Sequence, residues 1–209
     1  MGVDELSGRG RMTSGPRERF RSGIDGIDLE PGDHICCFYS GLDERDRILL
    51  SYLRAGVRDG DKCVCLIDAT DSEAMRVKID HRHQASPKQL VIEAATNAYL
   101  HQGRFSHDYM VGYLAETVNT ALVSDRFPFV RAVGEMSWVL EEPLGADELF
   151  IYERAINDFA PRYPQALLCM YGWRRFSGGM LFEAVKIHSK ILLNNCLIEN
   201  FWYMAPQTT

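Results

Sequence analysis

Short apolar runs alternate with amphipathic stretches along most of this chain. The apolar runs are typical of strands covered on both faces of a sheet, and they span 34–39, 62–68, 89–94, 129–135, 166–171 and 191–197. Apolar residues at helical spacing predict helices over 48–57, 72–79, 105–123, 146–159 and 179–187, the third of them capped by Ser106. The alternation predicts an α/β fold of three layers, a mainly parallel sheet with helices on both faces.

Residues 1–28 differ in kind from the rest of the chain. Glycine, serine and arginine dominate this segment, and no strand or helix period persists in it. We therefore expect a flexible N-terminal arm over 1–28 and a single globular domain over 29–206.

Composition narrows the class of protein. With 209 residues, 46% of them hydrophobic, the chain can bury a sizeable core. The net charge of −6 argues against direct nucleic-acid binding, and no apolar run approaches the roughly 18 residues of a membrane helix. The chain opens without an apolar signal region, and its cysteines lie mostly in strand-like runs, so we expect a cytoplasmic protein with reduced thiols.

The loop after the first predicted strand lies where many α/β proteins bind phosphate. Phosphate loops are rich in glycine and end in Lys-Ser or Lys-Thr, because backbone N–H groups and an ammonium group bind the anion. Residues 40–46, Ser-Gly-Leu-Asp-Glu-Arg-Asp, contain one glycine, no lysine and three carboxylates that would repel a triphosphate. The sequence indicates a nucleotide-binding scaffold that serves another purpose.

Ligands of open parallel sheets bind beyond the carboxyl ends of the strands. The residues there combine aromatic rings, carboxylates and arginines, as in a largely apolar pocket with a few orienting polar groups. We predict a ligand site made of Tyr39, Ser40, Asp68, Glu135, Trp138, Tyr171, Arg174, Arg175 and Phe176. Core packing is the simpler interpretation of Trp138, and Glu135 suits either a ligand hydrogen bond or an ion pair with an arginine.

Arg131 interrupts an apolar strand near the middle of the predicted sheet. A buried guanidinium needs a carboxylate partner, and Glu93 or Asp68 on nearby strands is the expected one. We interpret this arginine as part of the architecture rather than of a binding site.

A metal site is a weaker hypothesis. His34 and Cys36 share one face of a strand, and Cys63 and Cys65 share one face of another, so neighbouring strands in matching register would bring four tetrahedral ligands together. Cysteine is more often a small core residue, so we expect no metal and no other cofactor. The motifs Gly-x-Ser-x-Gly and His-Glu-x-x-His are absent, and we expect no enzymatic activity.

Several motifs resemble, in their order, those of one known family. They are His34-Ile35-Cys36, Gly103-Arg104-Phe105, Gly134-Glu135-Met136-Ser137-Trp138, Tyr152-Glu153 and Leu168-Cys169-Met170-Tyr171. Over residues 30–205 the chain resembles the MEDS domain, the methanogen/methylotroph sensory domain. The resemblance implies a RecA/KaiC-like fold without a working phosphate loop, which binds small hydrocarbon-derived ligands.

Two segments depart from the pattern of that family. Ile187-His188-Ser189 stands where Thr-His-Pro is usual. Asn200-Phe201-Trp202-Tyr203 replaces Asn-Pro-aromatic-Tyr, which adds aromatic bulk to any pocket wall formed there.

The resemblance and the acidic loop together predict a non-catalytic sensory or regulatory domain. It would bind a small organic ligand and signal by a population shift to a separate protein, such as a transcription regulator. The alternatives are a ligand-free protein-interaction adaptor derived from an ATPase-like fold and, as a minor one, residual nucleotide binding. A homo-oligomer is compatible with each of these functions.

Overall fold

The computed structural model describes residues 18–68, 72–82, 84–101, 103–141 and 145–205. Its centre is a seven-stranded sheet in the order β11-β10-β3-β9-β8-β4-β5. Neighbouring strands run parallel, except that β10 and β11 are antiparallel. The strands are β3 His34–Tyr39, β4 Lys62–Ile67, β5 Leu90–Ala94, β8 Val130–Glu135, β9 Gln165–Gly172, β10 Lys190–Leu193 and β11 Cys196–Glu199.

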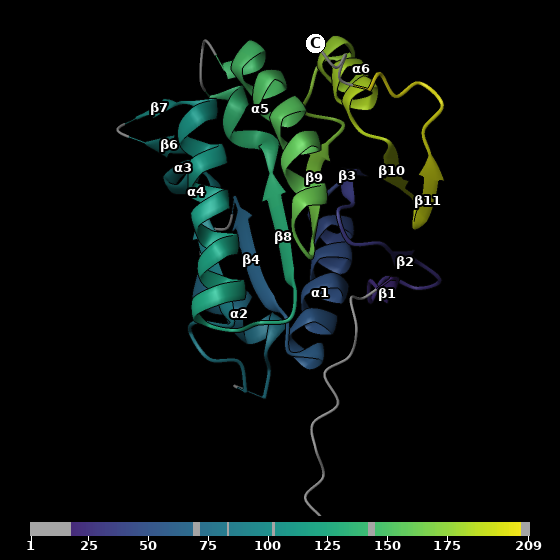
Figure 1. Cartoon of the computed structure of the whole chain (residues 1–209). Coiled ribbons are helices and arrows are strands. Elements are labelled where there is room, and N and C mark those ends of the chain that lie inside the picture. Colours follow the sequence, from purple (N-terminus) through teal and green to yellow (C-terminus); the bar gives the residue numbers. More distant parts are fainter. Residues whose placement is uncertain (1–17, 69–71, 83, 102, 142–144, 206–209) are drawn as a thin grey trace, which may run out of the picture.

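Helices cover both faces of this sheet, as Figure 1 shows, which confirms the predicted three-layer α/β architecture. One face carries α1 Leu42–Asp59 and α2 Ser72–Ile79, and the other carries α4 His107–Asn119, α5 Gly145–Phe159 and α6 Gly178–Ile187. The short elements are α3 Ala95–Tyr99, the hairpin of β6 Leu100–His101 and β7 Arg104–Phe105, a π-turn over Thr120–Ser124, and 3₁₀ turns over Met136–Leu140 and Ala160–Arg162. In the part of the chain that the structure describes, no helix has the length and apolarity needed to cross a bilayer.

A separate apolar core fills each side of the sheet. Side chains alternate along a strand, so Cys36 and Phe38 of β3 join the core beneath α4, α5 and α6. Cys37 and Tyr39 of the same strand join the core beneath α1 and α2. This alternation decides which predicted site residues can meet.

Residues 18–29 differ from the expected arm. β1 Phe20–Arg21 pairs with β2 Asp28–Leu29 in an antiparallel ribbon, and the ring of Phe20 lies 4.7 Å from that of Phe129. The buried residues of this segment are Phe20, Ser22, Ile24, Ile27 and Leu29. The prediction of a flexible arm is wrong for residues 18–28, which pack on the domain, and residues 1–17 lie outside the described part.

Three predicted elements have clearly different boundaries. The helix predicted over 48–57 begins at Leu42, so residues 42–46 of the predicted loop belong to α1. The run 191–197 is a hairpin rather than one strand, because Asn194 and Asn195 form its turn with φ of 50° and 59°. Asparagine tolerates this left-handed conformation better than other residues with a side chain. The helix predicted over 105–123 is α4 followed by the π-turn, and Ser106 caps it by accepting a hydrogen bond from the N–H of Tyr109.

Arg131 is fully buried, but its partners are not the predicted ones. Its guanidinium lies 2.8 Å from Asp59, the last residue of α1, and 2.8 Å from Asp61, in the turn that follows. The expectation of Glu93 or Asp68 is wrong, because Arg131 stands near the start of β8 whereas Asp68 follows the end of β4. Gly56 makes room for the pair, since a Cβ there would lie 2.7 Å from Cδ of Arg131.

Candidate functional site at the carboxyl ends of the strands

The loop that joins β3 to α1 is too short to surround a phosphate. Only Ser40 and Gly41 separate the strand from the helix. The carboxylate of Glu44 accepts hydrogen bonds from both the backbone N–H and the hydroxyl of Ser40, each at 2.7 Å. The carboxylate of Glu44, on α1, therefore accepts the hydrogen bonds that a phosphate loop would donate to its ligand.

These hydrogen bonds set the ionisation of Glu44. They lower the pKa of its carboxyl below the usual 4.5, because the hydroxyl and the N–H of Ser40 stabilise the charged form. A carboxyl with a lowered pKa in the folded state adds stability above its unfolded pKa and loses it as the pH falls through the folded pKa. In Ser40→Ala the carboxyl keeps only the backbone donor, so its pKa is expected to rise. An NMR pH titration of the Glu44 side chain measures this, and equal midpoints in the two proteins would refute the assignment.

Arg45 lies beneath this loop with its guanidinium buried. It donates to the Oε2 atom of Glu135 at 3.1 Å and to the backbone carbonyl of Asp68 at 3.2 Å. A second donor nitrogen lies 2.8 Å from Asp46. Although burial disfavours its charge, Glu135 and Asp46 raise the pKa of this guanidinium.

Glu135 is the centre of the network. Its Oε1 atom accepts a short hydrogen bond from the hydroxyl of Tyr39, and its Oε2 atom accepts from Arg45 and from the N–H of Asp68 at 2.9 Å. Burial raises the pKa of the Tyr39 hydroxyl well above its usual range, and the charge of Glu135 raises it further. Both carboxylate oxygens are engaged, so Glu135 is held by the protein and does not present a free carboxylate to a metal-bound nucleotide.

Asp68 forms the rim of this site. It accepts a hydrogen bond from Ser137, and Arg175 lies 3.7 Å from the same carboxylate across a more exposed gap. The network joins the ends of β3, β4 and β8 through hydrogen bonds and ion pairs, an arrangement suited to fixing these strand ends.

The structure brings together five of the nine predicted site residues: Tyr39, Ser40, Asp68, Glu135 and Arg175. The other four lie elsewhere. Trp138 is fully buried and stacks on Tyr99 at 5.0 Å between ring centroids. Tyr171 points to the other face of the sheet, where it contacts Phe176, and Arg174 lies over the ring of Trp173.

Four residues of the network were missed by the sequence-based prediction. They are Glu44, Arg45, Ser137 and Asp46, which pairs with Arg45. The burial of Arg45 could have been predicted, because this residue lies one turn before Ile48 and Leu49 on the buried stripe of α1. A charged residue on such a stripe needs a buried partner of opposite charge, and here the partner is Glu135.

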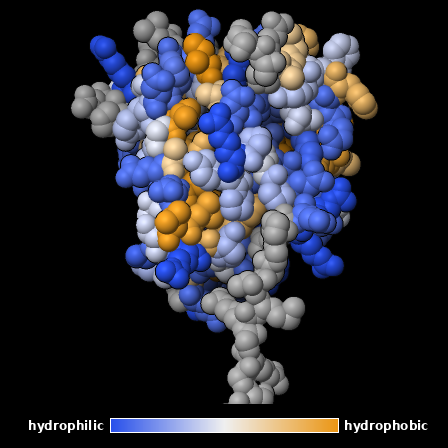
Figure 2. Space-filling model, in the orientation of Figure 1, coloured by the Kyte–Doolittle hydropathy of each residue, from blue (hydrophilic) through white to orange (hydrophobic). Residues whose placement is uncertain are grey.

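An apolar groove of about 440 Å³ opens on the opposite face of the sheet, between α6 and the strands β3 and β10. Its lining is Phe38, Trp173, Gly178, Leu181, Phe182, Val185 and Leu193. Hydrophobic residues also reach the surface in several places among hydrophilic ones (Figure 2). The groove lies near the predicted strand ends but uses other side chains, with Trp173 rather than Trp138 as its tryptophan.

The cysteine and histidine set proposed as a weaker metal hypothesis does not assemble. β9 and β8 separate β3 from β4 in the sheet, so the two pairs are not on neighbouring strands. They also face opposite cores, since Cys36 lies beneath α4, α5 and α6 whereas Cys63 and Cys65 lie beneath α1. That prediction of His34, Cys36, Cys63 and Cys65 as a joint site is wrong.

The model of one protein family matches most of this structure. It is the MEDS family, described as the methanogen/methylotroph, DcmR sensory domain, and it matches residues 33–189. The chain belongs to the MEDS family. This confirms the resemblance given by the motifs, and it makes the chain a sensory domain.

A curated relative agrees with this membership of the MEDS family. The transcriptional repressor DcmR of Methylorubrum extorquens is 28% identical over 186 residues. The match covers 84% of this chain and 66% of the repressor, so the MEDS chain spans slightly less than two thirds of that protein.

Solved structures confirm the expected RecA/KaiC-like fold of the MEDS domain. A KaiC-like protein from Pyrococcus horikoshii has a TM-score of 0.57 at 12% identity, over 84% of this chain and 80% of its own. An ATP synthase subunit from Nanoarcheaum equitans has a TM-score of 0.56 at 16% identity, over 89% of this chain and 52% of its own. At such identities the likeness concerns the fold alone.

Proposed function

We propose that this MEDS domain is a non-catalytic sensor that binds a small apolar organic molecule in the groove beside α6. Binding would favour one arrangement of α6, which a separate regulatory protein recognises. The groove is the observation that carries the proposal, because its lining is almost wholly apolar and includes two exposed aromatic rings, Trp173 and Phe182. A small hydrocarbon-derived ligand matches such a lining, whereas a nucleotide does not.

The closed network at Ser40 and Glu135 supports the non-catalytic part of the proposal. Glu44 takes the donors of the loop, and Arg45 occupies the carboxylate of Glu135. Magnesium and ATP would have to displace the hydrogen bonds between Ser40 and Glu44 and the ion pair between Arg45 and Glu135. Residual nucleotide binding is therefore the least favoured of the three candidate functions.

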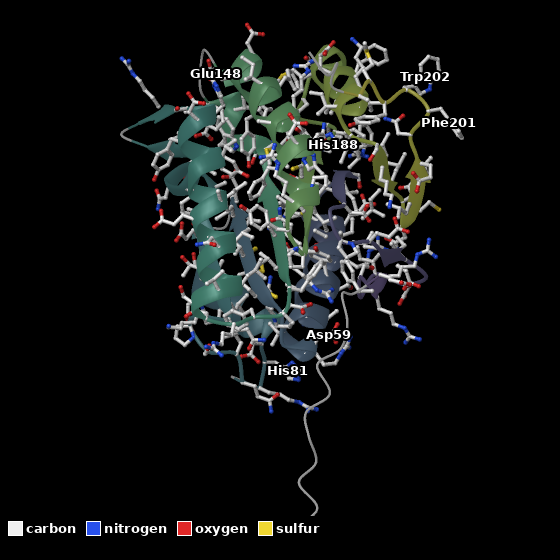
Figure 3. The ribbon with its side chains drawn as sticks, viewed as in Figure 1. Asp59, His81, Glu148, His188, Phe201 and Trp202 are labelled. Carbon is white, nitrogen blue, oxygen red and sulfur yellow. The ribbon has the colours of Figure 1, made fainter. Side chains whose placement is uncertain are left out.

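The residues after β11 are hydrogen-bonded to α6, the helix that lines the groove. The side-chain amide of Asn200 donates to the carbonyls of Val185 at 2.6 Å and His188 at 2.7 Å, and the N–H of Met204 donates to Lys186 at 2.8 Å. A ligand that moves Val185 would therefore move the segment 200–204. Figure 3 shows Phe201 and Trp202 of that segment at the outer edge beyond β11, where a partner can reach them.

A ligand that binds only the native state should stabilise the domain by mass action. At ten times its Kd the expected gain is about 1.4 kcal/mol in the free energy of unfolding, or roughly 3–6 °C in Tm. We would measure the Tm with benzene, cyclohexane and dichloromethane as probes and methanol as the polar control. Val185→Trp, which fills the groove, is expected to abolish the shift.

Val77→Trp provides the matched control for this experiment. Val77 is 42% exposed on α2, on the opposite face of the sheet, so the same substitution there should leave the ligand response intact. If no probe raises the Tm, or if both variants lose the response equally, the groove is not the ligand site.

A ligand-free adaptor is the second candidate, and exposed aromatic residues favour it. Phe201 is 95% exposed and Trp202 is 74% exposed, beside the edge strand β11. Edge strands and exposed apolar patches bind partner proteins or second copies of a chain. The absence of any ligand-induced shift would favour this function over the sensor.

A further inference from the structure

Four metal-ligating side chains converge in the core beneath α5 and α6. His34 begins β3, Glu153 comes from α5, Cys169 from the middle of β9, and His188 directly follows α6. Each is at most 4% exposed. One ligand atom from each lies within 4.8 Å of the corresponding atoms of the other three. Figure 3 shows His188 within the ribbon, near α6.

The hydrogen bonds around the two imidazoles define which nitrogen carries a proton. Nδ1 of His188 lies 2.8 Å from the carbonyl of Ala184, which can only accept, so this nitrogen donates. Nδ1 of His34 lies 2.9 Å from Oδ1 of Asn157, whose amide nitrogen donates to Ile187 at 2.8 Å. Both neutral rings therefore direct an Nε2 lone pair into the cluster.

Lone pairs crowd the centre of this cluster. The two Nε2 atoms lie 3.1 Å apart, and Oε2 of Glu153 lies 2.9 Å from His34 and 3.4 Å from His188. Sγ of Cys169 lies 3.2 Å from Nε2 of His34. Oε1 of Glu153 already accepts from Tyr171 at 2.6 Å, whereas Oε2 receives no hydrogen bond from a described donor. The thiol of Cys169 can donate to Nε2 of His34, but the two Nε2 atoms and Oε2 of Glu153 still face one another. Acceptors this close in a buried site repel one another unless a proton or a cation lies between them.

We propose that His34, Glu153, Cys169 and His188 bind a divalent transition-metal ion, and that zinc is the ion that fits best. Zinc takes nitrogen, sulfur and carboxylate ligands in a tetrahedron, and Zn–N and Zn–S bonds of the usual length place the ligand atoms about 3.3–3.6 Å apart. Four of the six separations between the ligand atoms are 2.9–3.4 Å, close to this geometry, and all six lie within 4.8 Å. Four protein ligands complete the coordination, as in structural zinc sites.

Metal sites need neighbouring groups that hydrogen-bond to the ligands and fix their orientation, and the four side chains have such neighbours. Ala184 and Asn157 orient the two imidazoles, and Tyr171 orients the carboxylate. A hollow of about 330 Å³, lined in part by Asn157, Lys186 and Ile187, lies next to the cluster, since Asn157 contacts His34 and Ile187 precedes His188. The ion would join α5 and the end of α6 to β3 and β9.

The experiment measures metal in the full chain, purified without an affinity tag from zinc-supplemented medium. Elemental analysis should find one zinc per wild-type chain. After removal of zinc with a chelator, cobalt(II) should give the strong visible bands of tetrahedral coordination and a thiolate-to-cobalt charge-transfer band. In Cys169→Ser the charge-transfer band should disappear. A wild-type chain that binds neither zinc nor cobalt overturns the proposal, whatever the variants do.

Two further variants separate coordination from folding. Cys37→Ser removes an equally buried thiol that points to the other core, so metal content should stay at the wild-type level. Asn157→Ala leaves all four ligands in place and should weaken zinc affinity about 10–100-fold, because it frees the ring of His34. Equal zinc affinity in the wild type, Cys169→Ser and Asn157→Ala, with native circular dichroism, would contradict the site. The result is independent of the groove, since a ligand response and metal binding are measured separately.

Discussion

Replacement of Arg131 by methionine is expected to lower the free energy of unfolding by about 3–5 kcal/mol. The guanidinium is fully buried between Asp61 and Asp59, and it also donates to the carbonyl of Ser22 at 3.0 Å. Methionine would fill much of the space but would remove the guanidinium that lies against the buried carboxylate of Asp61. The loss should also loosen the β1–β2 ribbon, because Arg131 packs on the ring of Phe20 at 4.8 Å.

Urea unfolding followed by circular dichroism measures this effect. Arg47→Met is the control, since Arg47 is 58% exposed at its side chain and its loss should change stability by no more than about 0.5 kcal/mol. The double variant Arg131→Met with Asp61→Asn should recover part of the stability, because it also removes the buried negative charge that Arg131 faced. A loss below about 1 kcal/mol in Arg131→Met would show that the buried pair is not structurally important.

Replacement of Arg45 by methionine is the second large expected loss, of about 3 kcal/mol. The guanidinium has a side-chain exposure of 6% and faces Glu135, whose side chain is 1% exposed. Without Arg45, Glu135 keeps its hydrogen bonds from Tyr39 and Asp68 but loses its counter-charge. The strand ends of β3, β4 and β8 should become less stable together.

A double-mutant cycle with Glu135→Gln tests this pairing. Each single variant should be destabilised, and the double variant should lose less than the sum, because glutamine keeps the shape and needs no cation. Urea unfolding of the four proteins gives the coupling energy. Strictly additive losses would mean that Arg45 and Glu135 do not interact in solution.

Much of the fold could be predicted from the sequence because the buried parallel strands have no polar face. The apolar runs at 34–39 and 129–135 therefore correspond to β3 and β8 almost residue for residue. Residues 18–29 could not be predicted in the same way. Their burial depends on single residues such as Phe20 and Leu29, separated by turns, and only contact with the finished domain makes them ordered.

The candidate sites were predictable only in part, since they depend on strand order. The acidic residues of 40–46 predict a phosphate site without its usual chemistry, but the sequence could not show that residues 42–46 begin α1 or that Glu44 and Arg45 bind the groups around it. The metal-ligating cluster could not be predicted from the sequence for the same reason. The strand pattern groups His34 with Cys36, Cys63 and Cys65, whereas its neighbours in space, Glu153, Cys169 and His188, lie more than a hundred residues away in sequence.

Glu44 has a consequence for the energy source of any signal from this domain. Proteins that hydrolyse a nucleotide can drive a conformational cycle in one direction, because each turnover releases chemical free energy. Here a side chain of the protein itself holds the donors of Ser40, and it cannot be exchanged or released. The sensor proposed above would therefore run at equilibrium: its output would follow the concentration of its ligand, reverse when the ligand leaves, and consume no nucleotide.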